Sequence, residues 1–188
     1  MNSLLPSRID AWQRLLAAHP PEWVLRHGRA VEAMAVAMAQ QADAVHLAVD
    51  VDLVARAALL HDIGRSVTQD LRHAHLGADM LRDDHWPDRV VWAVERHTGA
   101  GVTPDEARSH GLPERDYVPR SLEERIVAHA DNLYSGDKRQ DMAAVEAKYR
   151  TRGLDHAWQR IEALHEALCR ELDVDLEALA PAALDDLP

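Results

Sequence analysis

Four polar residues of this sequence occupy positions at which helical periodicity would otherwise place an apolar side chain: His27, His61, His97 and Asp131. His97, for example, continues a stripe formed by Val90 and Val94, and this spacing puts all three residues on one face of a helix. We therefore expect these imidazole and carboxylate groups to point toward the protein core. Each of them alone has a simpler explanation, such as a buried histidine satisfied by one hydrogen bond or an aspartate paired with an arginine.

Together, four inward-facing polar groups on separate helices need a shared partner, because an isolated buried carboxylate costs several kcal/mol. Neutral imidazoles and carboxylates that converge in a helical core are suited to a divalent transition metal, or to two metals if a carboxylate bridges them. The sequence has twelve histidines and 32 acidic residues, but Cys169 is its only cysteine. Any such site is therefore built from nitrogen and oxygen ligands, and neither an internal disulfide nor a thiolate cluster can form.

The elements that must position these residues are helices. Ala, Leu, Glu, Arg and Val recur at helical spacing, phenylalanine is absent, and few segments alternate in polarity, so the predicted fold class is all-α. Helices are expected at about residues 7–18, 22–41, 52–62, 74–84, 87–97, 121–134, 137–151 and 154–172. We expect Asp52 to cap the third of these helices, and Gly64 to end it in a left-handed conformation. A short helix should also start after Thr103, where proline and Glu106 follow at the positions of a capping box.

Apolar residues make up 47% of the 188 residues, which is enough for a real core. We expect one domain over residues 1–153, with a C-terminal helix and an acidic tail over residues 154–188 packed on it. The predicted boundary lies near Gly153.

The tetrapeptide His61-Asp62-Ile63-Gly64, with His27 upstream and Ala130-Asp131 downstream, resembles the signature of the HD superfamily of metal-dependent phosphohydrolases. It is similar in particular to the small stand-alone proteins that carry the His-Asp-Ile-Gly sequence. The resemblance covers about residues 22–139, and the fold it implies is an all-α bundle of five or more helices.

The resemblance also implies a set of six metal ligands, which fall on His27, His61, Asp62, His73, His97 and Asp131. In the dinuclear members, Asp62 would bridge two divalent ions, for which Fe, Mn, Co or Ni are the expected identities. His75 competes with His73, but residues two apart on a helix point to roughly opposite faces, so only one of them is expected in the site. We expect His129 to face away from Asp131, and His165 to lie at the surface.

The function implied is hydrolysis of a phosphate ester or anhydride, in a nucleotide or similar small phosphorylated molecule, by a water activated between two metals. Asp62 and Arg65 are the expected catalytic residues. Substrate contacts are expected from Arg65, Thr98, Lys138 and Arg139. Two alternatives stay open: a di-iron oxygenase of the same superfamily, and a module that senses nucleotides and binds metal without turnover.

Two departures limit the choice of substrate. The cyclic-dinucleotide phosphodiesterases of the superfamily have a second histidine where this chain has Thr98, and their Gly-Tyr-Pro segment is missing from this sequence. Relatives that hydrolyse diadenosine tetraphosphate share the six ligands, but this chain has a longer insertion, Gly99–Arg120, before the helix of Asp131. That insertion is either a lid or a connecting loop with one helical turn.

The net charge of −11, without any basic block, argues against binding to a nucleic-acid polymer or to anionic lipid. Charged residues interrupt the longest apolar stretch, around 42–60, so no bilayer span is expected. Residues 1–6 do not resemble a signal peptide, and the single cysteine fits a reducing cytoplasm. A homo-oligomer is compatible with this composition.

Overall fold

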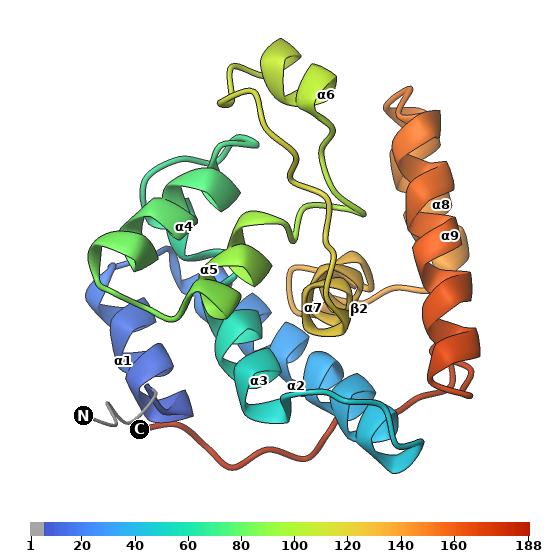
Figure 1. Ribbon diagram of the computed structural model, residues 1–188, viewed down its shortest axis with the longest axis horizontal. Coiled ribbons are helices and arrows are strands. Elements are labelled where there is room, and N and C mark those ends of the chain that lie inside the picture. The colour runs from blue at the N-terminus through green and yellow to red at the C-terminus, as the bar shows by residue number, and fades with distance from the viewer. Residues whose placement is uncertain (1–5) are drawn as a thin grey trace.

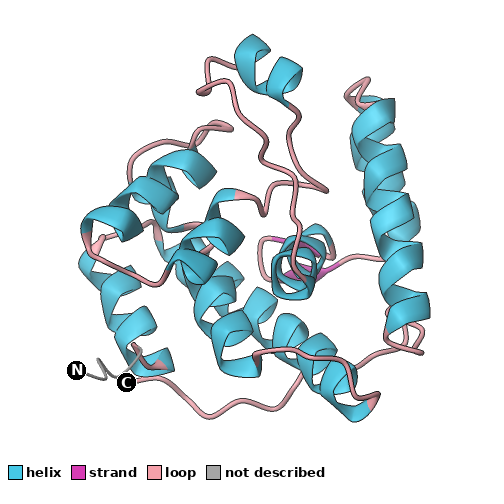
Figure 2. Ribbon diagram, in the orientation of Figure 1, coloured by secondary structure: helices cyan, strands magenta, loops and turns pink. Residues whose placement is uncertain are grey.

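The computed structural model describes residues 6–188, and within them the regular structure is almost entirely helical, as Figures 1 and 2 show. The expectation that no signal peptide is present concerns residues 1–5, which lie outside this range. The described helices are α1 (Arg8–Ala17), α2 (Glu22–Ala44), α3 (Val51–Leu60), the 3-10 helix η1 (Ile63–Ser66), α4 (His73–Asp83), α5 (Asp88–Glu95), α6 (Pro104–Ser109), α7 (Leu122–Asn132), α8 (Met142–Thr151) and α9 (Asp155–Glu171). The all-α expectation is confirmed.

The core forms where α2 and α3 pack on each other and on α7, which runs through the middle of the molecule in Figure 1. Met34 and Met38 of α2 are fully buried there, and alanines on both α2 and α3 allow the two helices to approach closely. The polar groups that these helices bury, such as His27, are therefore held by closely packed apolar neighbours.

The turn after α3 places the histidine–aspartate pair. Helix α3 starts after Asp50, whose side chain accepts a hydrogen bond from the backbone N–H of Leu53, so the expectation that Asp52 caps it is wrong. The expected left-handed Gly64 is also wrong, because this glycine lies in η1 and its φ is not positive. A Cβ at Gly64 would lie 2.0 Å from the carbonyl oxygen of His73 and 2.7 Å from the amide nitrogen of Gly77. Glycine is needed there because η1 packs directly against the start of α4.

A β-hairpin replaces the first part of the helix expected from residue 137. Strand β1 (Tyr134–Ser135) pairs antiparallel with β2 (Lys138–Arg139), and Gly136 adopts a φ of 60° in the turn. Helix α8 then starts at Met142, where Asp141 provides the cap. The hairpin changes the direction in which the side chains of residues 134–139 point.

The insertion at residues 99–120 carries α6, which stands at the top of the molecule in Figure 1. The capping box of Thr103 and Glu106 is present, as expected. A small apolar cluster of its own, formed by Val102, Ala107, Leu112 and Tyr117, supports the segment. Arg160 of α9 ties it to the rest of the molecule by donating to Glu106 at 2.8 Å and 2.9 Å.

Helix α9 shares the main core, because Trp158, Ile161, Leu164 and Leu168 are buried in the same cluster as the residues of α2 and α3. The segment after α9 returns across the molecule to α1, near the N-terminal end of the described chain (Figure 1). Within the described residues, no helix combines the length and the apolar character that crossing a bilayer requires.

Candidate metal centre

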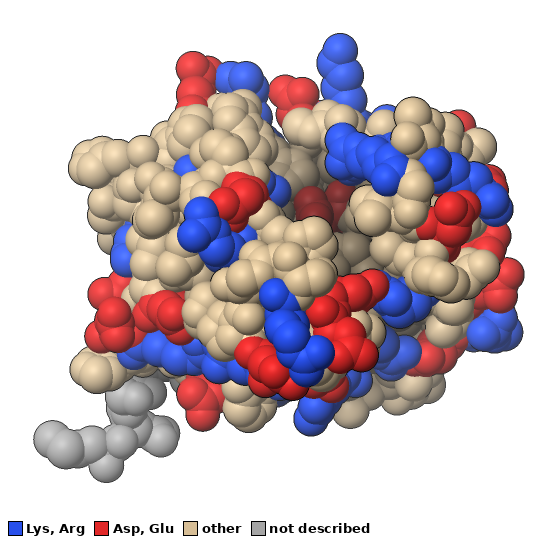
Figure 3. All heavy atoms as spheres, turned by 90° about the horizontal axis from the view of Figure 1, so that it is seen from above, with Lys and Arg blue, Asp and Glu red and all other residues tan. Residues whose placement is uncertain are grey.

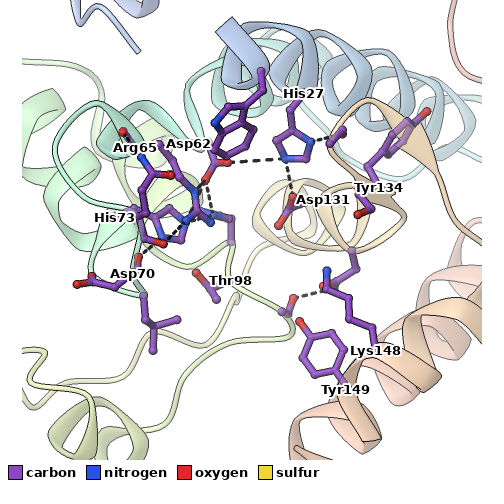
Figure 4. Close-up of a pocket in the computed structure, with 18 of the residues that line it drawn as sticks. His27, Asp62, Arg65, Asp70, His73, Thr98, Asp131, Tyr134, Lys148 and Tyr149 are labelled. Atoms are coloured by element: carbon purple, nitrogen blue, oxygen red, sulfur yellow. Dashed lines mark hydrogen bonds and ion pairs between the residues drawn. The ribbon is translucent and has the colours of Figure 1, made fainter. Parts of the chain in front are cut away.

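The six residues expected to bind metal meet at one place, although they come from five different segments. His27 lies on α2, His61 and Asp62 follow α3, His73 begins α4, His97 follows α5, and Asp131 lies near the end of α7. Figure 4 shows His27, Asp62, His73 and Asp131 pointing toward one another from these elements. The four histidines and Asp62 are buried, and Asp131 is only partly exposed.

The histidines form two pairs on either side of Asp62. Nε2 of His27 lies 3.1 Å from Nε2 of His61, and Nε2 of His73 lies 3.1 Å from Nε2 of His97. Oδ1 of Asp62 is 3.0 Å from His73 and 3.7 Å from His97, while Oδ2 is 3.8 Å from both His27 and His61. Asp131 joins the first pair, with Oδ1 2.9 Å from Nε2 of His27. One carboxylate oxygen of Asp62 therefore faces each pair.

Each imidazole is oriented by a backbone carbonyl that accepts a hydrogen bond from Nδ1–H. The acceptors are Gly136 for His27 at 2.6 Å, Ala58 for His61 at 2.7 Å, Asp70 for His73 at 2.8 Å and Val94 for His97 at 2.7 Å. A neutral imidazole carries only one N–H, so in this arrangement all four Nε2 atoms present lone pairs to the centre. Two lone pairs 3.1 Å apart repel each other and cannot form a hydrogen bond, so each pair requires a cation, either a proton on one ring or a metal ion, between or beside its nitrogens. This donor set fits a metal ion held by imidazole and carboxylate.

The electrostatics of the cluster also favour a positive charge. Burial opposes ionisation of Asp62, but the neighbouring His61 and His73 outweigh it and hold the pKa of Asp62 well below its usual range. The pKa of Asp131 is lowered in the same way, against its burial, by the neighbouring imidazoles of His27 and His61. Burial would lower the pKa of His61, yet the two carboxylates raise it to about 9, so without a metal ion a proton takes the cation's place on this ring. The centre therefore holds two ionised carboxylates, which attract a cation.

The centre lies in a cavity of about 380 Å³. Figure 3 shows the surface hollowed from above, with acidic side chains in the depth of the hollow. Arg65 lines the cavity as expected, with Nε 3.1 Å from Oδ1 of Asp62 and its guanidinium carbon 5.8 Å from the centre of the Trp23 ring. Thr98 lines it as well, and its buried hydroxyl has no hydrogen-bond partner within residues 6–188. Both side chains are placed to contact a bound molecule.

The structure does not bring Lys138 and Arg139 to this cavity. Both lie on β2, and Arg139 donates to the carbonyl oxygens of Leu176 and Leu179 at 2.8 Å, which holds the C-terminal segment. Lys138 is exposed. Neither residue lines the cavity, since both belong to the hairpin that replaces the first part of the expected helix.

The structure also gives His73 and His75 different positions, and only His73 lies in the cluster. Nδ1 of His75 lies 2.9 Å from a guanidinium nitrogen of Arg115, and Nε2 lies 3.3 Å from Asp79, so His75 lies outside the cluster. His129 faces away from Asp131, as expected, but His165 is not a free surface residue. Its Nδ1 lies 2.9 Å from Nε2 of the buried His129.

Helix α8 adds residues to the cavity that the sequence reading missed: Lys148, Tyr149 and Arg152. Burial, together with the negative charge of Asp131, raises the pKa of Tyr149 to about 12, so its hydroxyl stays protonated. Lys148 lies on α8 and Arg152 caps its C-terminal end. Their spacing of four residues, typical of neighbours on one helix face, is the signal that could have pointed to them.

A family model of the HD domain matches residues 24–136, which is more than half of the chain. The chain belongs to the HD domain family. The match includes all six residues of the metal cluster and ends at the turn of the hairpin, before α8.

Two relatives are similar to this chain over most of its length. A tRNA (cytidine(56)-2'-O)-methyltransferase of Thermoplasma volcanium is 44% identical over 158 residues, which are 84% of this chain and 45% of that protein. An uncharacterized protein of Methanocaldococcus jannaschii is 44% identical over 136 residues, or 72% of this chain and 80% of that protein. The chain thus spans less than half the length of the methyltransferase.

Among solved structures, the HD domain of the phosphodiesterase PgpH of L. monocytogenes, in complex with cyclic-di-AMP, superimposes with a TM-score of 0.53. The superposition covers 85% of this chain and 95% of that one at 18% sequence identity. At this identity the likeness establishes the fold that the two proteins share.

Proposed function

We propose that this protein is a metal-dependent phosphohydrolase that acts on a phosphate ester or anhydride of a nucleotide or a similar small molecule. The observation that carries the proposal is the set of four inward-facing Nε2 atoms arranged in two pairs on either side of Asp62, inside a cavity of about 380 Å³. Membership of the HD domain family and the fold shared with a phosphodiesterase support it.

The geometry favours two metal positions. His27, His61 and Asp131 would hold one ion, and His73 and His97 the other, with Asp62 shared between them. Divalent ions bound there would supply Lewis acidity and lower the pKa of water, which provides a nucleophile near neutral pH.

The protein's own residues supply orientation and charge. The four backbone carbonyls fix the imidazole rings, so the ligands keep their directions without reorganisation. Arg65 lies beside Asp62 and brings a positive charge to the position where phosphoryl oxygens would gather negative charge. The unpartnered hydroxyl of Thr98 offers a further hydrogen bond to the same group.

The two alternatives predict different chemistry from the same ligands. A di-iron oxygenase would require dioxygen, whereas hydrolysis would proceed equally with and without air. A sensing module would bind intact nucleotide and release no product. The name of the T. volcanium relative makes tRNA a further compound to include among the substrates tested.

The test is a screen for phosphate release with protein loaded with Mn or Fe, over nucleotides, dinucleoside polyphosphates, sugar phosphates and tRNA. Each reaction is run in air and under anaerobic conditions, with the His61→Ala and His75→Ala variants beside the wild type. We expect hydrolysis that is independent of oxygen, is abolished in His61→Ala, and is retained in His75→Ala. Turnover only in air, or activity that survives in His61→Ala, would overturn the proposal.

A further inference from the structure

Helix α8 forms a wall of the cavity opposite the histidines of α4 and α5. Figure 4 shows Lys148 and Tyr149 on this helix, across the cavity from His73 and Asp62. Arg152, the capping residue directly after α8, lines the cavity as well. The family match ends at residue 136, so this wall is formed by a part of the chain that the HD domain match does not include.

The charges on this wall have no acidic partner in the part of the chain that the structure describes, although Nζ of Lys148 lies 5.8 Å from the centre of the Tyr149 ring. Neither Lys148 nor Arg152 forms a salt bridge with any of residues 6–188. Arg150 lies between them on the same helix and behaves differently, since it pairs with Glu146 at 2.6 Å and with Asp155 at 3.4 Å. In a chain with 32 acidic residues, two unpaired cations beside one cavity indicate an anionic ligand. Figure 3 shows lysine and arginine side chains along the right-hand side of the hollow, where α8 and α9 lie in Figure 1.

Hydrogen-bonding capacity on this side is free as well. The Tyr149 hydroxyl makes no hydrogen bond within the described residues. It lies beside Gly99, since a Cβ added to that glycine would be 3.4 Å from the hydroxyl oxygen. Thr98, whose hydroxyl is also unpartnered in the described chain, precedes Gly99 and lines the same cavity. Two cations and two free hydroxyl groups are the donors that phosphate oxygens require.

A second hollow of about 340 Å³ continues from the cavity, between the insertion and helices α8 and α9. The two hollows share Leu71, Thr98, Gly99, Tyr149 and Arg152. Beyond these shared residues, the second hollow is lined largely by apolar side chains and backbone, with a few polar groups: Ala100, Gly101, Val102, Glu106, His110, Leu154, Ala157 and Arg160. Apolar walls with a few polar groups are typical of sites for an organic ring system.

We propose that α8 selects the substrate: Lys148 and Arg152 bind the phosphate oxygens of a nucleoside phosphate, and the second hollow receives its nucleoside. The phosphate then lies between the metal cluster and the cations of α8, while the organic group extends under α6. Phosphate compounds without such a group, including inorganic phosphate and small sugar phosphates, fill only the first part of this site. The inference deepens the proposed function and rests on it for the reaction, but not for the binding.

Binding is tested by isothermal titration of the metal-loaded protein with each of the four ribonucleoside monophosphates and with inorganic phosphate. We expect at least one nucleotide to bind ten times more tightly than inorganic phosphate. The double variant Lys148→Ala/Arg152→Ala should weaken that binding at least tenfold, and Arg150→Ala should change it less than twofold. Metal content should be the same in all three proteins. Equal binding by the double variant and the wild type would overturn the role of α8.

The second hollow is tested by filling it. Ala157→Trp should weaken nucleotide binding but leave the affinity for inorganic phosphate unchanged, and Leu154→Glu, at an exposed position, serves the same purpose if the first variant does not fold. No preference for nucleotides over inorganic phosphate, or a preference that survives both substitutions, would overturn the assignment of the organic group.

Kinetics separate this inference from the proposed function. Where a nucleotide is hydrolysed, the double variant should raise KM at least tenfold and change kcat less than threefold, because the cations act in binding. Hydrolysis with an unchanged KM would refute the inference and leave the proposed function intact. Nucleotide binding that depends on α8 without any turnover would refute the proposed function and leave the binding site intact.

Discussion

His73 and His75 are two residues apart on the first turn of α4, and the structure gives them unlike surroundings. His73 is buried with its Nε2 atom 3.0 Å from Asp62, whereas His75 contacts Arg115 and Asp79 outside the cluster. The sequence made both histidines candidates for the site. It also predicted that they point to roughly opposite faces of one helix, so that only one of them enters the site. Which face turns inward depended on how η1 docks on α4.

The first prediction concerns this pair. We expect His73→Ala to lose about one of two bound metal equivalents, since it removes one ligand of the pair with His97, and His75→Ala to keep both. Metal content measured by elemental analysis after gel filtration checks this. Equal loss in both variants, or no loss in His73→Ala, would contradict the arrangement.

The second prediction concerns His129, whose pKa is lowered to about 3 by burial and by the nearby His165. In an unfolded chain this histidine takes up a proton near pH 6.5, so the folded state resists protonation and loses stability as the pH falls below that value. Between pH 7.5 and 5.5, the free energy of unfolding of the wild type should fall by about 1.4 kcal/mol more than that of His129→Gln.

Urea unfolding of both proteins in the presence of a chelator measures this difference without a contribution from bound metal. The same pH dependence in both proteins would show that His129 is charged or exposed in the folded state.

At the scale of elements, the segments that could be predicted were those with strong helical periodicity or a clear cap, such as α2 and α6. The hairpin at residues 134–139 was missed because strands of two residues carry no alternation to detect. That local error also placed Lys138 and Arg139 at the cavity. The α8 wall was missed because its position follows from how the chain continues after the hairpin.

The third prediction concerns the contact between η1 and α4. Gly64→Ala would force a methyl group against the backbone of His73 and Gly77, so we expect it to cost about 3 kcal/mol and to displace His73 from the cluster. Gly153→Ala is the matched control, because no atom lies within 4 Å of the Cβ that it adds. Only the positive φ of +71° opposes this substitution, and we expect it to cost about 1 kcal/mol of stability.

Urea unfolding and metal content are measured on both variants. A Gly64→Ala protein with unchanged stability and full metal content would show that η1 and α4 are not packed as closely as described.

At the scale of the whole molecule, five segments distant in the sequence converge so that each contributes one or two ligands, and α8 closes the other side of the cavity. The order of the motifs predicted that these six residues would meet, and the HD domain match spans all of them. The form of the cavity was not predictable, since it depends on how the insertion and α8 pack around it. The cluster stays closed only while these segments hold together, so bound metal should also stabilise the fold by mass action.

The most direct test of the central claim is to locate the metals by anomalous X-ray scattering from crystals grown with manganese. We expect two peaks in the cluster, one beside His27, His61 and Asp131 and one beside His73 and His97, with Asp62 in contact with both. Crystals saturated with manganese in which the cluster is empty, or in which the metal lies at other residues, would contradict the account.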